Sequence, residues 1–379
     1  MTTEPTSLPD LASRPHGGTV LAASDEFFAD KENLIKAETP VFQPHTFTPK
    51  GQQYDGWETR RRFGRAEGHD WVLLRLGAPG TVRAIDVDTA FFLGNYPQRC
   101  RIEATGVEGY PGVPELEAAD WFELVPESPL AGGTHNVFTV DSDRRVTHVR
   151  LHILPDGGVA RLRVHGEVVP DPRELAVLPF DLAATLNGGT VLRCSDSFFS
   201  PPANMLQPGE SRFMADGWET ARRRDDGHDW ATLGLTCAAV PLLAEVATTH
   251  YRGNSPDRIA LSGVDGATAS PDDEGAWFPL LPETKLQPDT THRFRLAGDR
   301  PVTHVRIDSH PDGGIGRFRL YGRPTPRALH DLTARWLNRL PRPQAVHALN
   351  AAGLPGEKLA AELPRADVAD LLGPLLGTV

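Results

Sequence analysis

The chain contains few cysteines and no long apolar segment. Its three cysteines, Cys100, Cys194 and Cys237, are spread over 379 residues, and no two of them form a CxxC pair. An odd number of widely spaced cysteines favours neither a disulfide framework nor a zinc knuckle, so we expect small buried side chains. No run approaches the roughly 18 apolar residues of a membrane span, and the N-terminus lacks the basic start and apolar stretch of a signal peptide. We therefore expect a cytoplasmic protein with no membrane partner.

Positive charge is also scarce. The 39 Lys and Arg residues are outnumbered by 50 Asp and Glu residues, which gives a formal net charge of -11. Such a chain has no global positive field to attract phosphate backbones, so nucleic acid is not expected as a partner. The HExxH, phosphate-loop and GxSxG signatures are missing as well. The sequence requires no cofactor, although His, Asp and Glu in the loops could gather around a divalent metal.

Glycine and proline, by contrast, are abundant. The 36 glycines and 34 prolines separate short apolar runs instead of forming a low-complexity block. Residues 147–153 and 161–165 alternate apolar and polar side chains on either side of the turn sequence PDGG, which predicts an antiparallel hairpin. Further strands are expected at 18–24, 70–77, 81–92, 99–107 and 134–140. Many short strands without helical periodicity predict an all-β fold of antiparallel jelly-roll sandwiches.

Most of the motifs occur twice, in the same order. GGTVLAASDEFF at 17–28 returns as GGTVLRCSDSFF at 188–199, and DGWETRRR at 55–62 returns as DGWETARRR at 216–224. GHDW, GNYP (as GNSP) and the PDGG segment also recur, so we expect two tandem copies of one domain. After the second copy the apolar residues take a helical spacing. The expected parts are an N-terminal extension (1–16), repeat 1 (17–170), a linker (171–187), repeat 2 (188–326) and a helical tail (327–379).

Three duplicated polar clusters could carry chemistry. In the first, DGWET, the alternation of an extended chain points Glu58 and Arg60 away from Trp57. The second places His69 and Asp70 at the start of a strand, and the third is the PDGG turn. Each cluster also has a purely structural interpretation, as turn, core or loop cap. The catalytic candidates are the acids and histidines of both copies: Asp55, Glu58, His69, Asp70, Asp216, Glu219, His228 and Asp229.

In these motifs the sequence resembles the allantoicase family. GGTVLAASDEFF, YDGWETRRR, GHDW, LGNYP and THVRLHILPDGG carry the resemblance, which runs in order through both copies. It implies a tandem pair of galactose-binding-like jelly rolls and an amidinohydrolase that converts allantoate to (S)-ureidoglycolate and urea in purine degradation. The helical tail departs from the family pattern. The resemblance supplies no catalytic set, so the roles that follow are assigned from chemistry.

Allantoate is a small carboxylate whose central carbon bears two ureido groups. Its hydrolysis requires a group that holds the anion, an acid for the departing urea and a base for water. His69 or Glu58 could be the acid and Asp70 or Asp55 the base, with Asp156 as an alternative. Arginine suits the carboxylate because its planar fork donates two parallel hydrogen bonds. The substrate-binding candidates are Arg60, Arg150, Asp156 and their expected counterparts Arg222, Arg306 and Asp312.

Several alternatives remain open at this level. The two copies could each be active, share one site, or include one degenerate copy; because the clusters are intact in each, we expect loops of both to contribute. The rival function is a carbohydrate-binding or small-anion-binding tandem jelly roll without catalysis. Homo-oligomers are common among soluble enzymes, and we expect one here.

Overall fold

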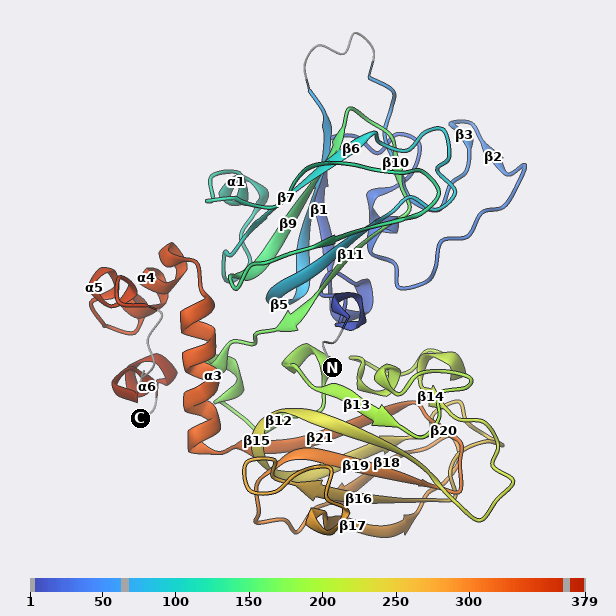
Figure 1. Ribbon diagram of the computed structural model, residues 1–379, viewed down its shortest axis with the longest axis vertical. Helices are drawn as coiled ribbons and strands as arrows, with labels where there is room; N and C mark the ends of the chain where they lie inside the picture. The colour runs from blue at the N-terminus through green and yellow to red at the C-terminus, as the bar shows by residue number, and fades with distance from the viewer. Residues whose placement is uncertain (1–3, 63–67, 364–368, 378–379) are drawn as a thin grey trace. The chain divides into compact units, whose positions relative to one another are not determined.

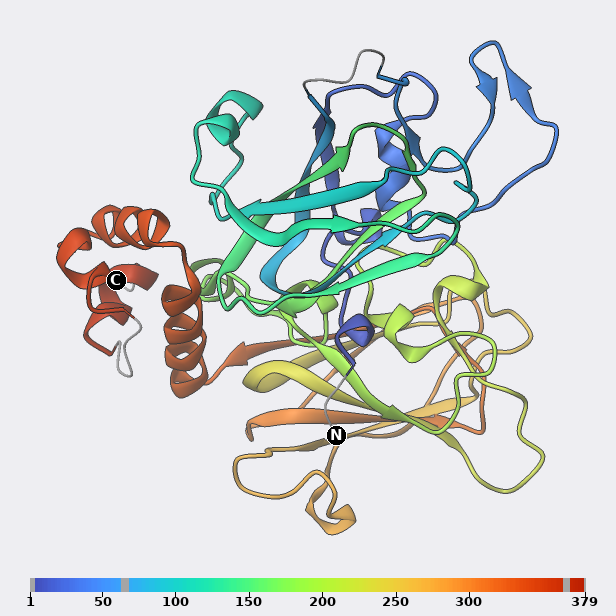
Figure 2. The same ribbon diagram turned by 45° about the horizontal axis from the view of Figure 1, so that its top comes forward.

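The computed structural model describes residues 4–62, 68–363 and 369–377, which form two compact units (Figures 1 and 2). The first unit contains repeat 1 together with α4 and α5, and the second contains repeat 2 together with α6. None of the described helices has the length and apolar character to cross a membrane.

Repeat 1 is built around one long strand. Its main sheet has the order β1-β5-β9-β6-β7, and β8 and β11 also pair with β5. The first half of β5 pairs with β1 and β9, and the second half pairs with β8 and β11, so one strand serves both groups of strands. The elements are β1 (Thr19–Ala23), β2 (Phe47–Thr48), β3 (Gly51–Gln52), β4 (Trp57–Glu58), β5 (Asp70–Asp88), β6 (Arg99–Thr105), α1 (Val113–Glu117), β7 (Phe122–Pro129), β8 (His135–Thr139), β9 (Arg145–Leu154), β10 (Gly158–Val159) and β11 (Arg161–Val168).

Repeat 2 has the same construction around β15, whose two halves pair with β13 and β19 and with β18 and β21. Its elements are α2 (Pro172–Leu175), β12 (Phe180–Asp181), β13 (Thr190–Cys194), β14 (Trp218–Glu219), β15 (Asp229–Ala247), β16 (Arg258–Val264), β17 (Phe278–Lys285), β18 (Thr291–Arg295), β19 (Val302–His310), β20 (Gly314–Ile315) and β21 (Arg317–Pro324). The tail consists of α3 (Pro326–Arg339), α4 (Arg342–Ala351), α5 (Gly356–Ala360) and α6 (Ala369–Leu376).

The strands form because apolar residues alternate with polar ones and can face a common core. β6 and β16 have the same succession of exposed and buried positions, and so do β8 and β18. The core of repeat 2 is a cluster of buried side chains that includes Trp218, Leu261, Ile307 and Phe318. The prediction of an all-β fold with tandem jelly-roll sandwiches and a helical C-terminal region is confirmed.

Two local predictions are wrong. The segments 147–153 and 161–165 do form strands, but β9 pairs with β5 and β6 and β11 pairs with β5, so they are not a hairpin. The strands expected at 70–77 and 81–92 are joined in β5, because the chain continues through Gly77 and Pro79 without leaving the sheet. All three cysteines are free, and Cys100 is buried.

Candidate functional site at the motif end of each repeat

Four of the duplicated motifs converge on one cavity in repeat 1. The cavity has a volume of about 770 Å³, within the range of small-molecule sites. Its walls come from DGWETRRR, GNYP and PDGG, with two phenylalanines of ASDEFF. The lining residues are Phe27, Phe28, Glu58, Thr59, Arg60, Arg61, Gly94, Asn95, Tyr96, Gln98, Pro155, Asp156 and Gly157.

Glu58 faces this cavity because of its place in β4. β4 pairs with β10, and the preceding Trp57 is fully buried, with its indole Nε1 donating to the carbonyl of Asp25 at 2.8 Å. Asn95 Nδ2 donates to Glu58 Oε1 at 2.8 Å. Burial raises the pKa of Glu58, although the Asn95 hydrogen bond opposes the shift. The raised pKa increases the fraction of Glu58 that carries a proton near neutral pH, as a general acid requires.

The PDGG turn supplies the opposite wall and has strict backbone requirements. Gly157 has a φ of 142°, and a Cβ on Gly158 would lie 2.0 Å from a ring carbon of Phe92. Asp156 Oδ2 accepts the backbone N–H of Arg62 at 2.7 Å, which ties the turn to the DGWETRRR segment. Repeat 2 repeats this contact between Asp312 and the N–H of Arg223 at 2.9 Å.

Arg60 is an exposed cation of the cavity. Its Nε donates to Asp25 at 2.8 Å, and its guanidinium lies 5.0 Å from the centre of the Phe27 ring. The side chain is 67% exposed, so its other guanidinium N–H groups can reach a ligand.

The second copy has no arginine at the position of Arg60. The backbone N–H groups of Arg60 and Ala221 make the same hydrogen bond, to Asp25 and to Asp196. Pairing Arg60 with Arg222 from the sequence was therefore wrong: the extra residue in DGWETARRR makes Ala221 the counterpart of Arg60 and Arg222 that of Arg61.

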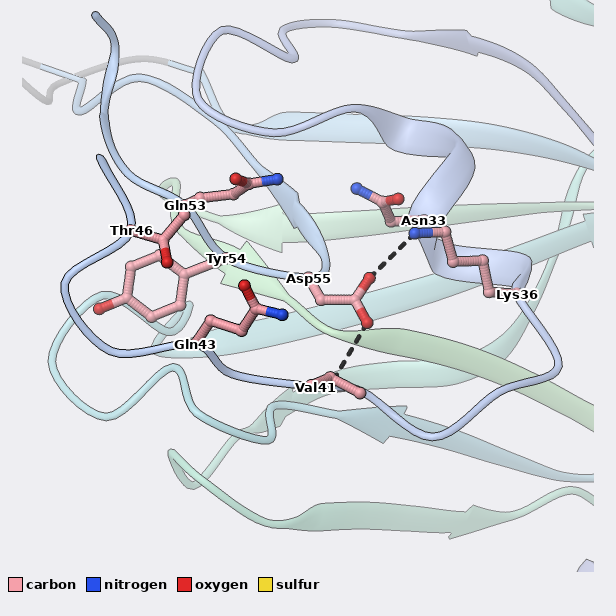
Figure 3. Close-up of a pocket in the computed structure, with 8 residues that line it drawn as sticks. All are labelled: Asn33, Lys36, Val41, Gln43, Thr46, Gln53, Tyr54 and Asp55. Carbon is pink, nitrogen blue, oxygen red and sulfur yellow. Dashed lines mark hydrogen bonds and ion pairs between the residues drawn. The ribbon is translucent and has the colours of Figure 1, made fainter. Parts of the chain in front are cut away.

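Asp55 is not among the residues that line this cavity, and Asp55 and its counterpart Asp216 each bind a buried arginine. Asp55 Oδ2 accepts from Arg161 at 2.6 Å and from the N–H of Val41, and Oδ1 accepts from Lys36 at 3.1 Å; Figure 3 shows the last two contacts beside a pocket of about 240 Å³. Burial opposes ionisation of Asp55, but these hydrogen bonds outweigh it and hold its pKa below the ordinary value. Asp216 binds Arg317 at 3.1 Å and has its pKa lowered in the same way.

Asp70 and Asp229 also accept hydrogen bonds from neighbouring side chains of their own repeats. Each is buried at the start of the long strand, and one oxygen of each accepts from a serine hydroxyl and an arginine. Within the described chain, the other oxygen of each has no hydrogen-bond partner. Arg62 links Asp70 to the Asp156 turn, because its guanidinium donates to Asp70 and its backbone N–H donates to Asp156.

His69 is part of a polar chain that the motifs alone did not reveal. His69 Nε2 lies 2.7 Å from His152 Nδ1, and His152 Nε2 lies 2.8 Å from Glu103 Oε2. In repeat 2, His228 Nε2 lies 3.0 Å from Asp308 Oδ1, which also accepts from Arg306 at 2.8 Å. His152 and Glu103 come from alternating strands in which polar residues could simply have been solvent-facing, so their sequence carried no signal of this contact.

Arg150 lies in a different, smaller cavity of about 280 Å³ with His152, Trp71 and Glu117. Its guanidinium is 4.2 Å from the centre of the Trp121 ring, and burial lowers its pKa. Its counterpart Arg306 lies over Trp230 and pairs with Asp308 and Glu274.

Repeat 2 keeps the acid of the first cavity. Glu219 Oε1 accepts from Asn254 Nδ2 at 2.5 Å, as Glu58 does from Asn95. The two asparagines belong to GNYP and GNSP, so their duplication was the signal that could have identified them. In the described ranges of both repeats, no three or more His, Cys, Asp or Glu residues are grouped so that they could hold a metal ion.

Comparison with known proteins identifies both repeats. A family model described as "Allantoicase repeat" matches residues 9–169 and 180–325. A "Probable allantoicase" of Streptomyces avermitilis is 48% identical over 342 residues, covering 87% of this chain and 89% of that protein. A "Probable allantoicase" of Nocardia farcinica is 50% identical over 319 residues, covering 84% and 94%. The crystal structure of allantoicase from Saccharomyces cerevisiae matches with a TM-score of 0.71 at 35% identity, covering 83% of this chain and 93% of that one.

Proposed function

The chain belongs to the allantoicase family, and from this premise we propose that it hydrolyses allantoate to ureidoglycolate and urea in the cavity of repeat 1. The observation that carries the proposal is the convergence of four duplicated motifs around Glu58. The cavity of about 770 Å³ can hold a small carboxylate together with the water that attacks it.

Glu58 is the proposed general acid. Its raised pKa keeps part of the population protonated, and Asn95 fixes one of its oxygens. The proton passes from Glu58 to the nitrogen of the departing ureido group while the bond between that nitrogen and the central carbon breaks, which releases urea. The lone pair of the remaining ureido nitrogen stabilises the positive charge that develops on the carbon.

Water then completes the reaction. Its oxygen bonds to the central carbon to give the hydroxyl of ureidoglycolate, and one of its protons passes to a base. Asp156 lines the cavity, and His69 directly precedes Asp70, whose backbone N–H donates to Pro155 of the cavity wall, so either side chain can accept it. The substrate carboxylate binds Arg60, with Arg61 beside it on the same wall.

The other candidates have supporting places in this scheme. Asp55 and Asp70 fix the walls through Arg161 and Arg62, and Arg150 belongs to a separate cavity. In repeat 2, Glu219 and Asp312 repeat the acid and the turn, while Ala221 leaves the site without one arginine. We therefore assign most of the turnover to repeat 1.

The test is to incubate the purified protein with allantoate and to measure urea release, with and without a chelator. Allantoin and ureidoglycolate serve as alternative substrates. Urea from allantoate alone is the expected result, and loss with chelator that added metal restores would identify a metal requirement. An absence of urea under every condition, together with binding of sugars or small anions, would support the rival binding module.

A further inference from the structure

His69 ends a chain of four side chains that fixes where its proton lies. Arg101 Nη1 donates to Glu103 Oε1 at 2.8 Å, Glu103 Oε2 lies 2.8 Å from His152 Nε2, and His152 Nδ1 lies 2.7 Å from His69 Nε2. Across the β6–β9 pairing, Arg101 lies opposite His152 and Glu103 lies opposite Arg150, so the sheet fixes the separation of these side chains.

The tautomers follow from the order of donors and acceptors. An ionised carboxylate only accepts, so His152 must donate Nε2–H to Glu103, and its Nδ1 becomes an acceptor. His69 must then donate Nε2–H to His152. This leaves Nδ1 of His69 as an unprotonated lone pair, and no hydrogen-bond partner contacts it within the described residues.

The electrostatics keep both rings neutral. Burial, together with the nearby Arg101 and Arg62, lowers the pKa of His69 against the opposing charges of Asp70 and Glu103. Burial also lowers the pKa of His152 to about 4 despite its bond to Glu103. Near neutral pH the chain therefore holds one proton at each hydrogen bond and no extra one.

His69 lies at the same end of the sandwich as the cavity. It directly precedes Asp70, whose backbone N–H donates to the carbonyl of Pro155 at 3.1 Å, and Pro155 lines the cavity. We propose that His69 Nδ1 is the base that takes the proton of the attacking water, and that His152 and Glu103 are positioning residues that hold it in this tautomer. The inference rests on the proposed function and names the base of that site.

Repeat 2 reaches the same tautomer with different residues. Ser262 replaces Glu103, because Ser262 pairs with Arg306 as Glu103 pairs with Arg150. Asp308 replaces His152, because Asp308 pairs with Trp230 as His152 pairs with Trp71. The Asp308 carboxylate accepts directly from His228 Nε2, so Nδ1 of His228 is again left without the proton. His152 and Asp308 are chemically different partners, yet both accept the Nε2–H of the histidine that precedes the long strand. The tautomer of His69 and His228 is therefore the feature that the two repeats share.

Substitution of Glu103 by Gln should reverse the direction of the hydrogen bonds that run from His69 through His152 to residue 103. Arg101 would retain the amide oxygen, so the amide NH₂ would donate to His152 Nε2, and His69 would carry its proton on Nδ1. We expect E103Q to lower kcat by roughly 100-fold or more with little change in KM, because the base is lost while the binding groups remain. Ser262→Ala, at the matched position of repeat 2, should stay within about twofold of wild type.

The tautomer itself is read by long-range ¹H–¹⁵N NMR of protein labelled at histidine, with His69→Gln used to assign the signal. Wild-type protein should show His69 protonated at Nε2, and E103Q should show it at Nδ1. Protonation at Nδ1 in the wild type, or full kcat in folded E103Q, would overturn the inference. If the wild type has the expected tautomer but releases no urea from allantoate, the proposed function fails instead.

Discussion

The two repeats agree in their acid and differ in the groups around it. Both keep a glutamate held by an asparagine: Glu58 with Asn95, and Glu219 with Asn254. Beside this pair, repeat 1 has Arg60 and repeat 2 has Ala221. An acid without the adjacent arginine can donate a proton but holds a carboxylate less well. Under the proposed function, repeat 2 therefore keeps the framework of the site but lacks one of the arginines that would bind the substrate carboxylate.

Removing the acid from each repeat gives the largest expected effect. Glu58→Gln keeps the shape and an acceptor for Asn95 but removes the proton, so kcat on allantoate should fall by about 10² to 10⁴-fold. Glu219→Gln is the matched control and should cost about twofold at most. Steady-state kinetics should be measured on both variants. An equal loss of activity in E219Q and E58Q would contradict the assignment of most of the turnover to repeat 1.

Breaking the buried arginine pairs should affect stability equally in the two repeats. Asp55→Ala leaves Arg161, which is 1% exposed, without its carboxylate, and Asp216→Ala does the same to Arg317. Removing one partner of such a pair typically costs about 3–5 kcal/mol. Urea unfolding should show both losses, with kcat per folded molecule close to wild type. A specific loss of kcat in D55A at full stability would return Asp55 to the catalytic set.

These losses should depend on pH in a defined direction. The pKa of folded Asp55 lies below that of the unfolded side chain, so its contribution is complete above the unfolded pKa of about 3.9 and disappears as the pH falls through the folded pKa. The stability difference between wild type and D55A should therefore narrow in acid.

How much of this could be predicted from the sequence depends on the range of the interactions. Period-two alternation predicts β6 and β8 because it is local, and duplication identifies Glu58 and Asp156. Strand partners are not local: the hairpin prediction failed because β9 and β11 both pair with β5. The lengths and sequence of the loops could not show this.

The polar chain behind His69 was missed for the same reason. Glu103 and His152 are 49 residues apart and meet only through the β6–β9 register. In repeat 2 the equivalent contact uses Asp308, so a comparison of the two copies residue by residue shows no common motif there. Homo-oligomer formation stays a prediction.

Exchanging the residues at positions 60 and 221 tests whether Arg60 accounts for the difference between the two repeats. Arg60→Ala should raise KM for allantoate by about 10 to 100-fold, the range expected for hydrogen bonds to a charged group, with a smaller effect on kcat. In the E58Q background, where repeat 1 is impaired, Ala221→Arg should increase the residual kcat/KM if repeat 2 lacks only this group. No change in KM for R60A would remove the arginine from the proposed site.

The smallest effect expected is a gain of stability in the variant that loses most activity. Burial raises the pKa of Glu58, so the folded state binds its proton more tightly than the unfolded state does. That group stabilises the protein below its unfolded pKa, and the contribution is lost as the pH rises through the folded pKa. Gln at position 58 carries no charge at any pH and should make the protein more stable than wild type at neutral and alkaline pH. Thermal unfolding from acid to alkaline pH, with E219Q as the reference for the same change of side chain, should show the gain growing with pH. A gain that is independent of pH would mean that packing, not ionisation of Glu58, is its cause.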